Sequence, residues 1–164
     1  DPAVVFHLIR NAHMSVDELD TLFNKRSGMM GLTGFGDLRE VHRLVEEGNE
    51  DAKLALDIYV HRIVGYIGNY TAQMGGVDVI TFTAGVGEND DVVRKMVCDK
   101  LAPFGVKLDE EKNATRSKEP RIISTPDSKI TICVIPTNEE LAIARKSAAI
   151  AEAGEDTYGN VFSK

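Results

Sequence analysis

The chain has 164 residues, a formal net charge of -7, and 43% hydrophobic against 27% charged residues. This is the length of one ordinary domain, and the composition is typical of a soluble globular protein. The acidic balance and the lack of a basic block argue against nucleic-acid binding, because contacts with the phosphate backbone need clustered Lys and Arg. No apolar run approaches the roughly 20 residues that cross a bilayer, so we expect no membrane association.

The start of the chain and its cysteines favour a reducing, cytoplasmic setting. Residues 1–3 show neither the basic lead nor the apolar block of a signal peptide. The two cysteines, Cys98 and Cys133, form no C-x-x-C pair, and both are predicted to be small buried hydrophobes. We therefore expect a cytoplasmic protein.

The first half of the chain is predicted to be helical. Ser15 and Glu18 form a capping box, in which both side chains satisfy free backbone N–H groups, and this begins a short helix. Residues 28–36 form a small-residue, apolar stretch, and a second helix is expected over residues 37–47, before a glycine that favours a helix end. The longest helix is expected over residues 51–74, because an apolar side chain recurs every three or four positions. This apolar stripe consists of Leu56, Tyr59, Ile63, Ile67, Tyr70 and Met74.

The second half of the chain alternates between strands and helices. Residues 77–83 are rich in β-branched side chains and follow two glycines, which predicts a buried strand. A helix is expected over residues 90–101, and two further strands over residues 121–124 and 130–135. A final helix is expected after Pro136, ending near residue 152.

This order of elements indicates an α/β fold. The strands at residues 77–83 and 130–135 are each followed by a helix, and we predict that they lie in one sheet. The sequence contains no internal repeat and no linker, so we expect a single domain over residues 1–164, with a frayed tail from Gly154.

One candidate site lies between the first strand and the helix that follows it. Residues 83–89 read Thr-Ala-Gly-Val-Gly-Glu-Asn, and glycines at such a place let the backbone approach a ligand, while helix N-terminal N–H groups attract anions. The sequence is not the G-x-G-x-x-G fingerprint, because Asp90 occupies the third glycine position, and no Gly-Lys-Ser/Thr follows as in a P-loop. A tight strand-to-helix turn explains it equally well.

A second candidate follows the last strand. Thr137 and Glu140 are spaced as a capping box, which would explain both residues without any ligand. Glu139 is not needed for that cap. A carboxylate at the mouth of a nucleotide crevice is a suitable partner for Mg²⁺ or its waters, although the spacing alone favours a purely structural role.

A third candidate is the segment Asp37, Leu38 and Arg39. Asp37 has the position of a helix N-cap, which is the simple explanation for it. Arg39 is expected either in solvent or against a base or a phosphate. The four histidines, by contrast, do not cluster, and Asp57 with His61 on one helix face lacks the third ligand of a metal site. These histidines are His7, His13, His42 and His61.

Three motifs in the right order resemble the acetate and propionate kinase family. They are Ser-Gly-Met-Met-Gly-Leu-Thr-Gly at residues 27–34, Phe-Thr-Ala-Gly-Val-Gly-Glu-Asn at residues 82–89, and Ile-Pro-Thr-Asn-Glu-Glu-Leu-Ala-Ile-Ala-Arg at residues 135–145. The resemblance extends over essentially the whole chain and matches the C-terminal half of that family. It implies the α/β fold of the superfamily of actin, Hsp70 and sugar kinases, in which a mixed sheet is flanked by helices.

The resemblance also implies a function and a set of site residues. Acetate kinases reversibly transfer the γ-phosphoryl group of ATP to acetate, giving acetyl phosphate and ADP, with Mg²⁺ as cofactor, and they are typically homodimers. Residues 1–164 would be the C-terminal, nucleotide-binding and dimerisation lobe. Glu139 matches the magnesium-linked glutamate of the family. The residues that match its nucleotide-contacting segments are Asp37, Leu38, Arg39, Gly85, Val86, Gly87, Glu88 and Asn89.

The beginning of the chain departs from the family pattern. It starts at Asp1, Pro2 and Ala3, where the Arg-Ser-Gly-Asp-hydrophobic-Asp-Pro segment of the family is ending. The resemblance therefore implies that the N-terminal lobe, with its catalytic residues, is absent. Because phosphoryl transfer depends on positioning and charge stabilisation, we expect no catalytic residue here and no activity from this chain alone.

Three alternatives remain open. A propionate kinase of the same family is one, because the residues of the acyl pocket lie largely outside the chain. A stand-alone, non-catalytic module for nucleotide binding or dimerisation is another, and the upstream reading frame would distinguish it. A Rossmann-type oxidoreductase domain is disfavoured by the missing third glycine and by the lack of a suitably placed acidic residue.

Overall fold

The computed structural model describes residues 1–153, and its chain divides into two compact units, Asp1–Gly76 and Val77–Lys164. Each unit is considered by itself. The expectation of one domain over residues 1–164 stays a prediction, and the expected frayed tail from Gly154 lies outside the described residues.

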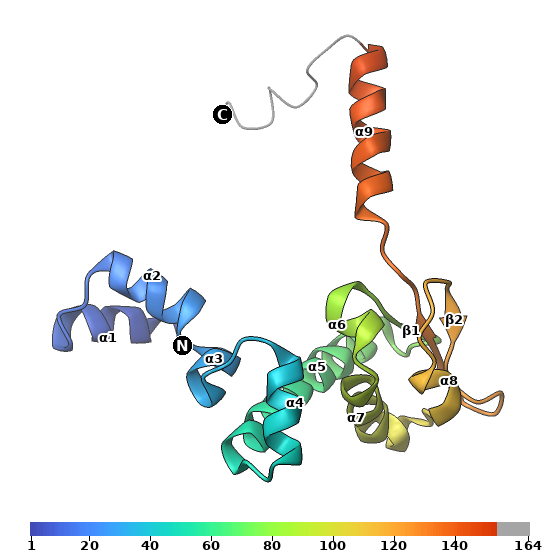
Figure 1. The fold of residues 1–164 in the computed structure, drawn as a ribbon, viewed down its shortest axis with the longest axis horizontal. Helices are drawn as coiled ribbons and strands as arrows, with labels where there is room; N and C mark the ends of the chain where they lie inside the picture. Colours follow the sequence, from blue (N-terminus) through green and yellow to red (C-terminus); the bar gives the residue numbers. More distant parts are fainter. Residues whose placement is uncertain (154–164) are drawn as a thin grey trace. The chain divides into compact units, whose positions relative to one another are not determined.

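The first unit is helical, as predicted (Figure 1). The capping box is confirmed, since the Ser15 Oγ accepts from the Glu18 N–H at 3.3 Å and the Ser15 N–H donates to the Glu18 carboxylate at 2.8 Å. The glycine-rich stretch forms a short helix, in which a Cβ at Gly31 would lie 2.7 Å from the carbonyl oxygen of Arg26. The helices of this unit are α1 (Ala3–Asn11), α2 (Val16–Lys25), α3 (Gly28–Thr33), α4 (Leu38–Glu46) and α5 (Glu50–Met74).

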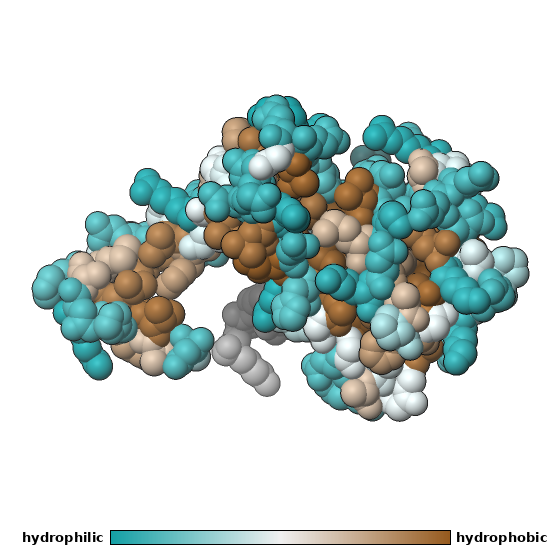
Figure 2. Space-filling model, turned by 90° about the horizontal axis from the view of Figure 1, so that it is seen from below, coloured by the Kyte–Doolittle hydropathy of each residue, from teal (hydrophilic) through white to brown (hydrophobic). Residues whose placement is uncertain are grey.

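The long helix α5 agrees with the predicted range of 51–74 to within one residue. Its N-terminal half supplies the buried residues, and the helix packs against α3 and α4. The predicted stripe is not buried along its whole length, because Tyr70 and Met74 are 55% and 65% exposed. Figure 2 shows hydrophobic residues among the polar ones at the molecular surface.

The second unit contains a mixed sheet, as the family resemblance implied, and the strands predicted at residues 77–83 and 130–135 lie in it side by side, as predicted. The sheet has three strands in the order β1-β3-β2, with β1 parallel and β2 antiparallel to β3 (Figure 1). In the register of the parallel pair, Val79 lies opposite Thr131 and Phe82 opposite Val134. The elements of this unit are β1 (Val79–Phe82), α6 (Ala84–Asn89), α7 (Asp91–Leu101), the 3-10 turn η1 (Ala102–Phe104), α8 (Glu110–Ala114), β2 (Arg121–Ile122), β3 (Thr131–Val134) and α9 (Glu139–Ala153).

The prediction that the first strand is buried is wrong. Among the strands that the structure describes, β1 lies at an edge of the sheet and pairs with β3 alone, so that Val79 is 51% exposed and Phe82 only half-buried. The central strand β3 instead places Ile132 and Val134 in the core. A β-branched run therefore identified a strand correctly, whereas its burial depended on its place in the sheet.

The core of the second unit combines α7 with the sheet. Burial raises the pKa of the Cys98 thiol to about 11, and this residue is the buried hydrophobe that was predicted. Cys133, on β3, is only half-buried. The buried apolar residues of this unit are Val93, Val97, Cys98, Leu101, Val106, Ile123, Ile130, Ile132 and Val134.

Within residues 1–153, no helix is both long enough and apolar enough to span a membrane.

Candidate functional site

The turn from β1 into α6 contains a strained residue. Ala84 is the first residue of α6 and has a φ of 60°, in the left-handed region. A side chain with a Cβ makes this conformation unfavourable by about 1 kcal/mol or more. Such strain persists where the surrounding structure imposes it, and it gathers at ligand-binding and catalytic sites. The turn is therefore a candidate site on the geometry of its own backbone.

Helix α6 folds back closely onto the end of β1. A Cβ at Gly87 would lie 3.2 Å from the carbonyl carbon of Phe82, so a larger residue here would crowd the end of the strand. The Asn89 side chain, at the end of α6, bonds back to its first turn, since Nδ2 donates to the Gly85 carbonyl oxygen at 2.8 Å. The tight strand-to-helix turn predicted for residues 83–89 is confirmed, and contacts of this segment with a nucleotide stay a prediction.

A buried arginine holds the end of α6 in place. Arg94, on α7, is 2% exposed, and its Nη1 donates to the carbonyl oxygens of Gly87 and Glu88, at 3.0 Å each. Its Nε and Nη2 donate to the side-chain and backbone oxygens of Asn113, at 2.8 and 2.7 Å. Burial lowers the pKa of Arg94, and the charge of Arg121 lowers it further. The guanidinium thus links α6, α7 and α8 through four hydrogen bonds.

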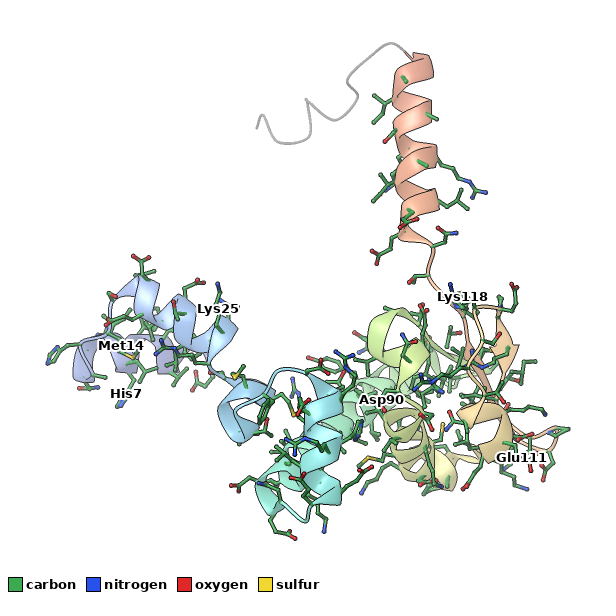
Figure 3. The ribbon with its side chains drawn as sticks, in the orientation of Figure 1. His7, Met14, Lys25, Asp90, Glu111 and Lys118 are labelled. Atoms are coloured by element: carbon green, nitrogen blue, oxygen red, sulfur yellow. The ribbon has the colours of Figure 1, made fainter. Side chains whose placement is uncertain are left out.

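Arg94 was not identified from the sequence, although a signal for it exists. The helix that contains it, α7, is capped by Asp90, whose side chain accepts from the Val93 N–H at 2.9 Å; Asp90 lies between α6 and α7 (Figure 3). Arg94 stands between Val93 and Val97 on the apolar side of this helix. An arginine on the buried face of an amphipathic helix needs several acceptors, and this indicates a polar network.

Glu88 connects α6 to the segment after β3. Its Oε1 accepts from the backbone N–H of Thr137 at 2.8 Å and from the Thr137 hydroxyl at 3.1 Å. The two residues are 49 positions apart in the chain. The backbone hydrogen bond from Thr137 is the main cause that lowers the pKa of Glu88. Two of the three candidate segments are therefore in direct contact.

The predicted capping box of Thr137 and Glu140 is wrong. Helix α9 is capped instead by Asn138, whose Oδ1 accepts from the Leu141 N–H at 2.9 Å and whose carbonyl accepts from the Ala142 N–H at 3.1 Å. Because the helix begins one residue later than the pattern suggested, Thr137 is outside it and pairs with Glu88. Glu139 is exposed at the first position of α9, where it takes no part in the cap.

The third candidate segment lies in the first unit. Asp37 caps α4 as predicted, since its Oδ1 accepts from the Arg39 N–H at 2.9 Å. The Arg39 guanidinium, 89% exposed, donates from Nε and Nη2 to the same carboxylate. This side-chain pairing lowers the pKa of Asp37 to about 2. Leu38 is half-buried. The part of these residues in one site with residues 85–89 stays a prediction.

The metal-ligating residue types do not cluster. In the described part of the chain, no group of three His, Cys, Asp or Glu could hold a metal ion. His7 lies on α1 (Figure 3), with its ring nitrogen 3.0 Å from the Asn11 amide, and both Asp57 and His61 are exposed on α5. A metal here would therefore depend on isolated carboxylates such as Glu139, together with oxygen atoms from a ligand.

Known proteins share both the sequence and the fold of this chain. Residues 1–145 match the Acetokinase family. The acetate kinase of Leifsonia xyli subsp. xyli is 54% identical over 154 residues, which are 94% of this chain and 39% of that protein. The crystal structure of acetate kinase from Porphyromonas gingivalis matches with a TM-score of 0.82 and 40% identity, over 92% of this chain and 38% of that one. A propionate kinase from Francisella tularensis subsp. tularensis matches with a TM-score of 0.80 and 38% identity, over 89% and 37%.

The chain spans about two fifths of the length of these proteins. The family match covers residues 1–145, and it includes the motifs at residues 27–34, 82–89 and 135–145. The sheet and its flanking helices give the α/β architecture that those motifs implied. The chain belongs to the acetokinase family.

Proposed function

We propose that the protein carrying this chain is an acetate kinase, which reversibly transfers the γ-phosphoryl group of ATP to acetate and gives acetyl phosphate and ADP. In this proposal residues 1–164 are its C-terminal, nucleotide-binding and dimerisation lobe. The observation that carries the proposal is the contact between two connecting segments, one after each strand of a parallel pair. The two strands, β1 and β3, have their carboxyl ends opposite each other, at Phe82 and Val134.

In open α/β sheets, ligands bind in the crevice outside the carboxyl ends of parallel strands. Here β1 leads directly into α6 and β3 leads into α9, and Glu88 joins the two connections through Thr137. The strain at Ala84 and the close approach at Gly87 add to the case for this turn. We propose that Gly85, Val86, Gly87 and Asn89 of α6 lie against the nucleotide, with Asp37, Leu38 and Arg39 as a second contact.

Glu139 suits a magnesium ion that accompanies the nucleotide. Mg²⁺ is commonly bound by one or two carboxylates together with substrate phosphates and waters, rather than by a cage of protein ligands. Glu139 offers an exposed carboxylate two residues after Thr137, which Glu88 holds, and residues 1–153 contain no protein cage of three ligands. When bound, the ion would neutralise charge on the transferring phosphoryl group. We assign Glu139 to it on this basis.

We also propose that residues 1–164 alone do not transfer a phosphoryl group, and that the full-length protein is a homodimer. Phosphoryl transfer needs cationic groups on the γ-phosphate and an oriented acceptor, and the chain spans only 39% of the Leifsonia acetate kinase. Sedimentation of the full-length protein at tens of micromolar tests the dimer, and a monomer would contradict it.

The activity is tested by incubating the full-length protein with ATP, Mg²⁺ and acetate and measuring acetyl phosphate as its hydroxamate. We expect turnover by the full-length protein and none by the 164-residue chain. Turnover by the chain alone would contradict the proposal that residues 1–164 do not transfer a phosphoryl group by themselves. A full-length protein that binds ADP but makes no acetyl phosphate would instead be a non-catalytic nucleotide-binding module.

Propionate is the second candidate acceptor, because a propionate kinase shares the fold at a TM-score of 0.80. The ratio of kcat/KM for acetate and propionate in the same assay decides between them. A higher value for propionate would replace acetate in the proposal without changing the type of reaction.

A further inference from the structure

The carboxylate of Glu88 is already engaged within the protein. One oxygen, Oε1, accepts both the N–H and the hydroxyl of Thr137, at 2.8 and 3.1 Å. Because both donors belong to one residue, the contact fixes the Glu88 side chain and the Thr137 backbone together. A hydrogen bond to an ionised carboxylate is stronger than one between neutral groups. The contact is therefore well suited to hold two segments in register.

The α6 end of this contact is firmly anchored. Arg94 donates to the carbonyl oxygens of Gly87 and Glu88 from a buried position, and it is tied in turn to Asn113. The Glu88 backbone is thus attached to the core of the unit through α7 and α8. A side chain on such a backbone can transmit this rigidity to its partner.

At the Thr137 end of the contact, few other interactions hold the chain in place among the described residues. Sheet pairing reaches Ile135, whose N–H donates to the Phe82 carbonyl oxygen at 2.9 Å, and α9 begins at Glu139. The side chains of α9 are exposed from Glu139 to Ala149. Burial therefore contributes little to holding the start of this helix. Among the described residues, the hydrogen bonds between Glu88 and Thr137 tie the segment before α9 to α6.

We propose that Glu88 is a positioning residue, which holds Thr137 so that the first turn of α9, with Glu139, is fixed beside the nucleotide-holding turn α6. This rests on the proposed function, and it changes the role expected for Glu88 from the sequence. In the earlier expectation Glu88 contacts the nucleotide itself. In this proposal it acts on the nucleotide only through Thr137 and Glu139.

The first test is amide hydrogen exchange of the full-length protein without nucleotide or metal. In Glu88→Ala we expect the amides of Thr137 and Leu141 to exchange about tenfold faster, since a charge-assisted hydrogen bond is lost. Glu88→Gln keeps an acceptor oxygen and should lie between Glu88→Ala and the wild type. Glu119→Ala, a change of an exposed glutamate elsewhere in the unit, is the matched control and should leave both amides unchanged. Unchanged exchange in Glu88→Ala would overturn the proposal.

The second test separates positioning from direct nucleotide contact. For Glu88→Ala we expect the Mg²⁺ concentration at half-maximal rate to rise about fivefold to tenfold, with partial rescue in Glu88→Gln. The affinity for metal-free ADP, measured by calorimetry, should change by less than about twofold. In a Glu139→Ala background, Glu88→Ala should add no further shift in the Mg²⁺ dependence. A large loss of metal-free ADP affinity with an unchanged Mg²⁺ dependence would instead make Glu88 a nucleotide ligand.

The two tests also separate this proposal from the proposed function. If the wild-type protein makes no acyl phosphate, the proposed function fails, whereas the exchange of Thr137 and Leu141 still reports whether Glu88 holds the start of α9. If the wild type is active and neither the exchange nor the Mg²⁺ dependence responds to Glu88→Ala, the positioning role fails by itself.

Discussion

Arg94 and Asn113 form a buried pair in which one guanidinium meets both oxygens of one asparagine, at 2.8 Å from Nε to Oδ1 and 2.7 Å from Nη2 to the backbone carbonyl. Asn113 is itself held, since its Nδ2 donates to the Asp91 carbonyl oxygen at 2.9 Å. The remaining donor group of Arg94 reaches the end of α6. The two residues are 19 positions apart in the chain, and together they support the proposed nucleotide-binding turn.

We expect Arg94→Leu to destabilise the second unit by about 3 kcal/mol, because the carbonyl oxygens that it serves are left in the interior without donors. Asn113→Ala should be less costly, and a double-mutant cycle should give a coupling of about 1 kcal/mol or more. Urea unfolding measures both. Arg116→Leu is the matched control on an exposed arginine, expected within about 0.5 kcal/mol of the wild type. Equal effects of Arg94→Leu and Arg116→Leu would contradict the structural role.

A second prediction concerns the strained turn. Ala84 is exposed with a φ of 60°, so that Ala84→Gly removes strain without removing packing. We expect this variant to be more stable by about 0.5–1 kcal/mol. Ala72→Gly, at an exposed position inside α5, has the opposite expectation, a loss of about 0.5–1 kcal/mol, because the conformation there is ordinary helix. Thermal unfolding of both variants decides, and a loss of stability in each would show that Ala84 is not strained.

A third prediction is a pH dependence at the turn before β3. The Lys107 ammonium, followed by the Thr125 hydroxyl at 2.7 Å, lowers the pKa of Asp127 from 3.8 to about 2. Because the folded pKa lies below the unfolded one, the stabilisation is fully present above about pH 3.8 and is lost as the pH falls towards 2. Carboxyl NMR should find the midpoint of Asp127 well below that of an ordinary aspartate. The contact is exposed, so added salt should weaken the shift.

Substitution of the lysine tests the cause. In Lys107→Met the pKa of Asp127 should rise towards its ordinary value, with the hydroxyl of Thr125 retaining part of the shift. Lys118→Met changes an exposed lysine in the connection between α8 and β2 (Figure 3), and it should leave the titration of Asp127 unaltered. If both variants moved the midpoint equally, general charge rather than the contact with Lys107 would be responsible.

Features that depend on near neighbours in the chain could be predicted from the sequence. The Ser15 capping box and the Asp37 cap involve hydrogen bonds over two or three positions, so the residue types carry the whole signal. The strand, the turn at residues 83–89 and the following helix were identified for the same reason. Their physical causes are local propensity, glycine conformation and helix capping.

Features that depend on distant partners could not be predicted. Thr137 has the spacing of a capping residue, yet it pairs with Glu88, 49 positions away, and Asn138 takes the cap. Arg94 likewise meets Asn113 only once α7 and α8 have packed together. The exposure of β1 follows from its place at the edge of the sheet, which strand propensity does not contain. Tertiary contacts decided each of these cases.

The last prediction concerns Glu139 in the full-length protein. If this carboxylate serves the magnesium ion, Glu139→Ala should lower turnover about 10–100-fold and raise the Mg²⁺ concentration needed for half-maximal rate. The fold should tolerate the change, because Glu139 is exposed and Asn138 supplies the helix cap. Acetyl phosphate formation over a Mg²⁺ titration, together with thermal unfolding, measures both effects.

Glu140→Ala is the matched control for this substitution. Both glutamates lie in the first turn of α9 and are exposed. The interaction of each carboxylate with the helix dipole should therefore stabilise the helix to a similar degree, about 0.3–1 kcal/mol. Neither caps the helix, whereas Asn138→Ala should loosen its first turn by about 1 kcal/mol. A loss of turnover and a shift in Mg²⁺ dependence confined to Glu139→Ala would therefore reflect the metal and not the helix. Equal effects of the two glutamate substitutions would mean that helix electrostatics accounts for them and that Glu139 has no separate role with magnesium.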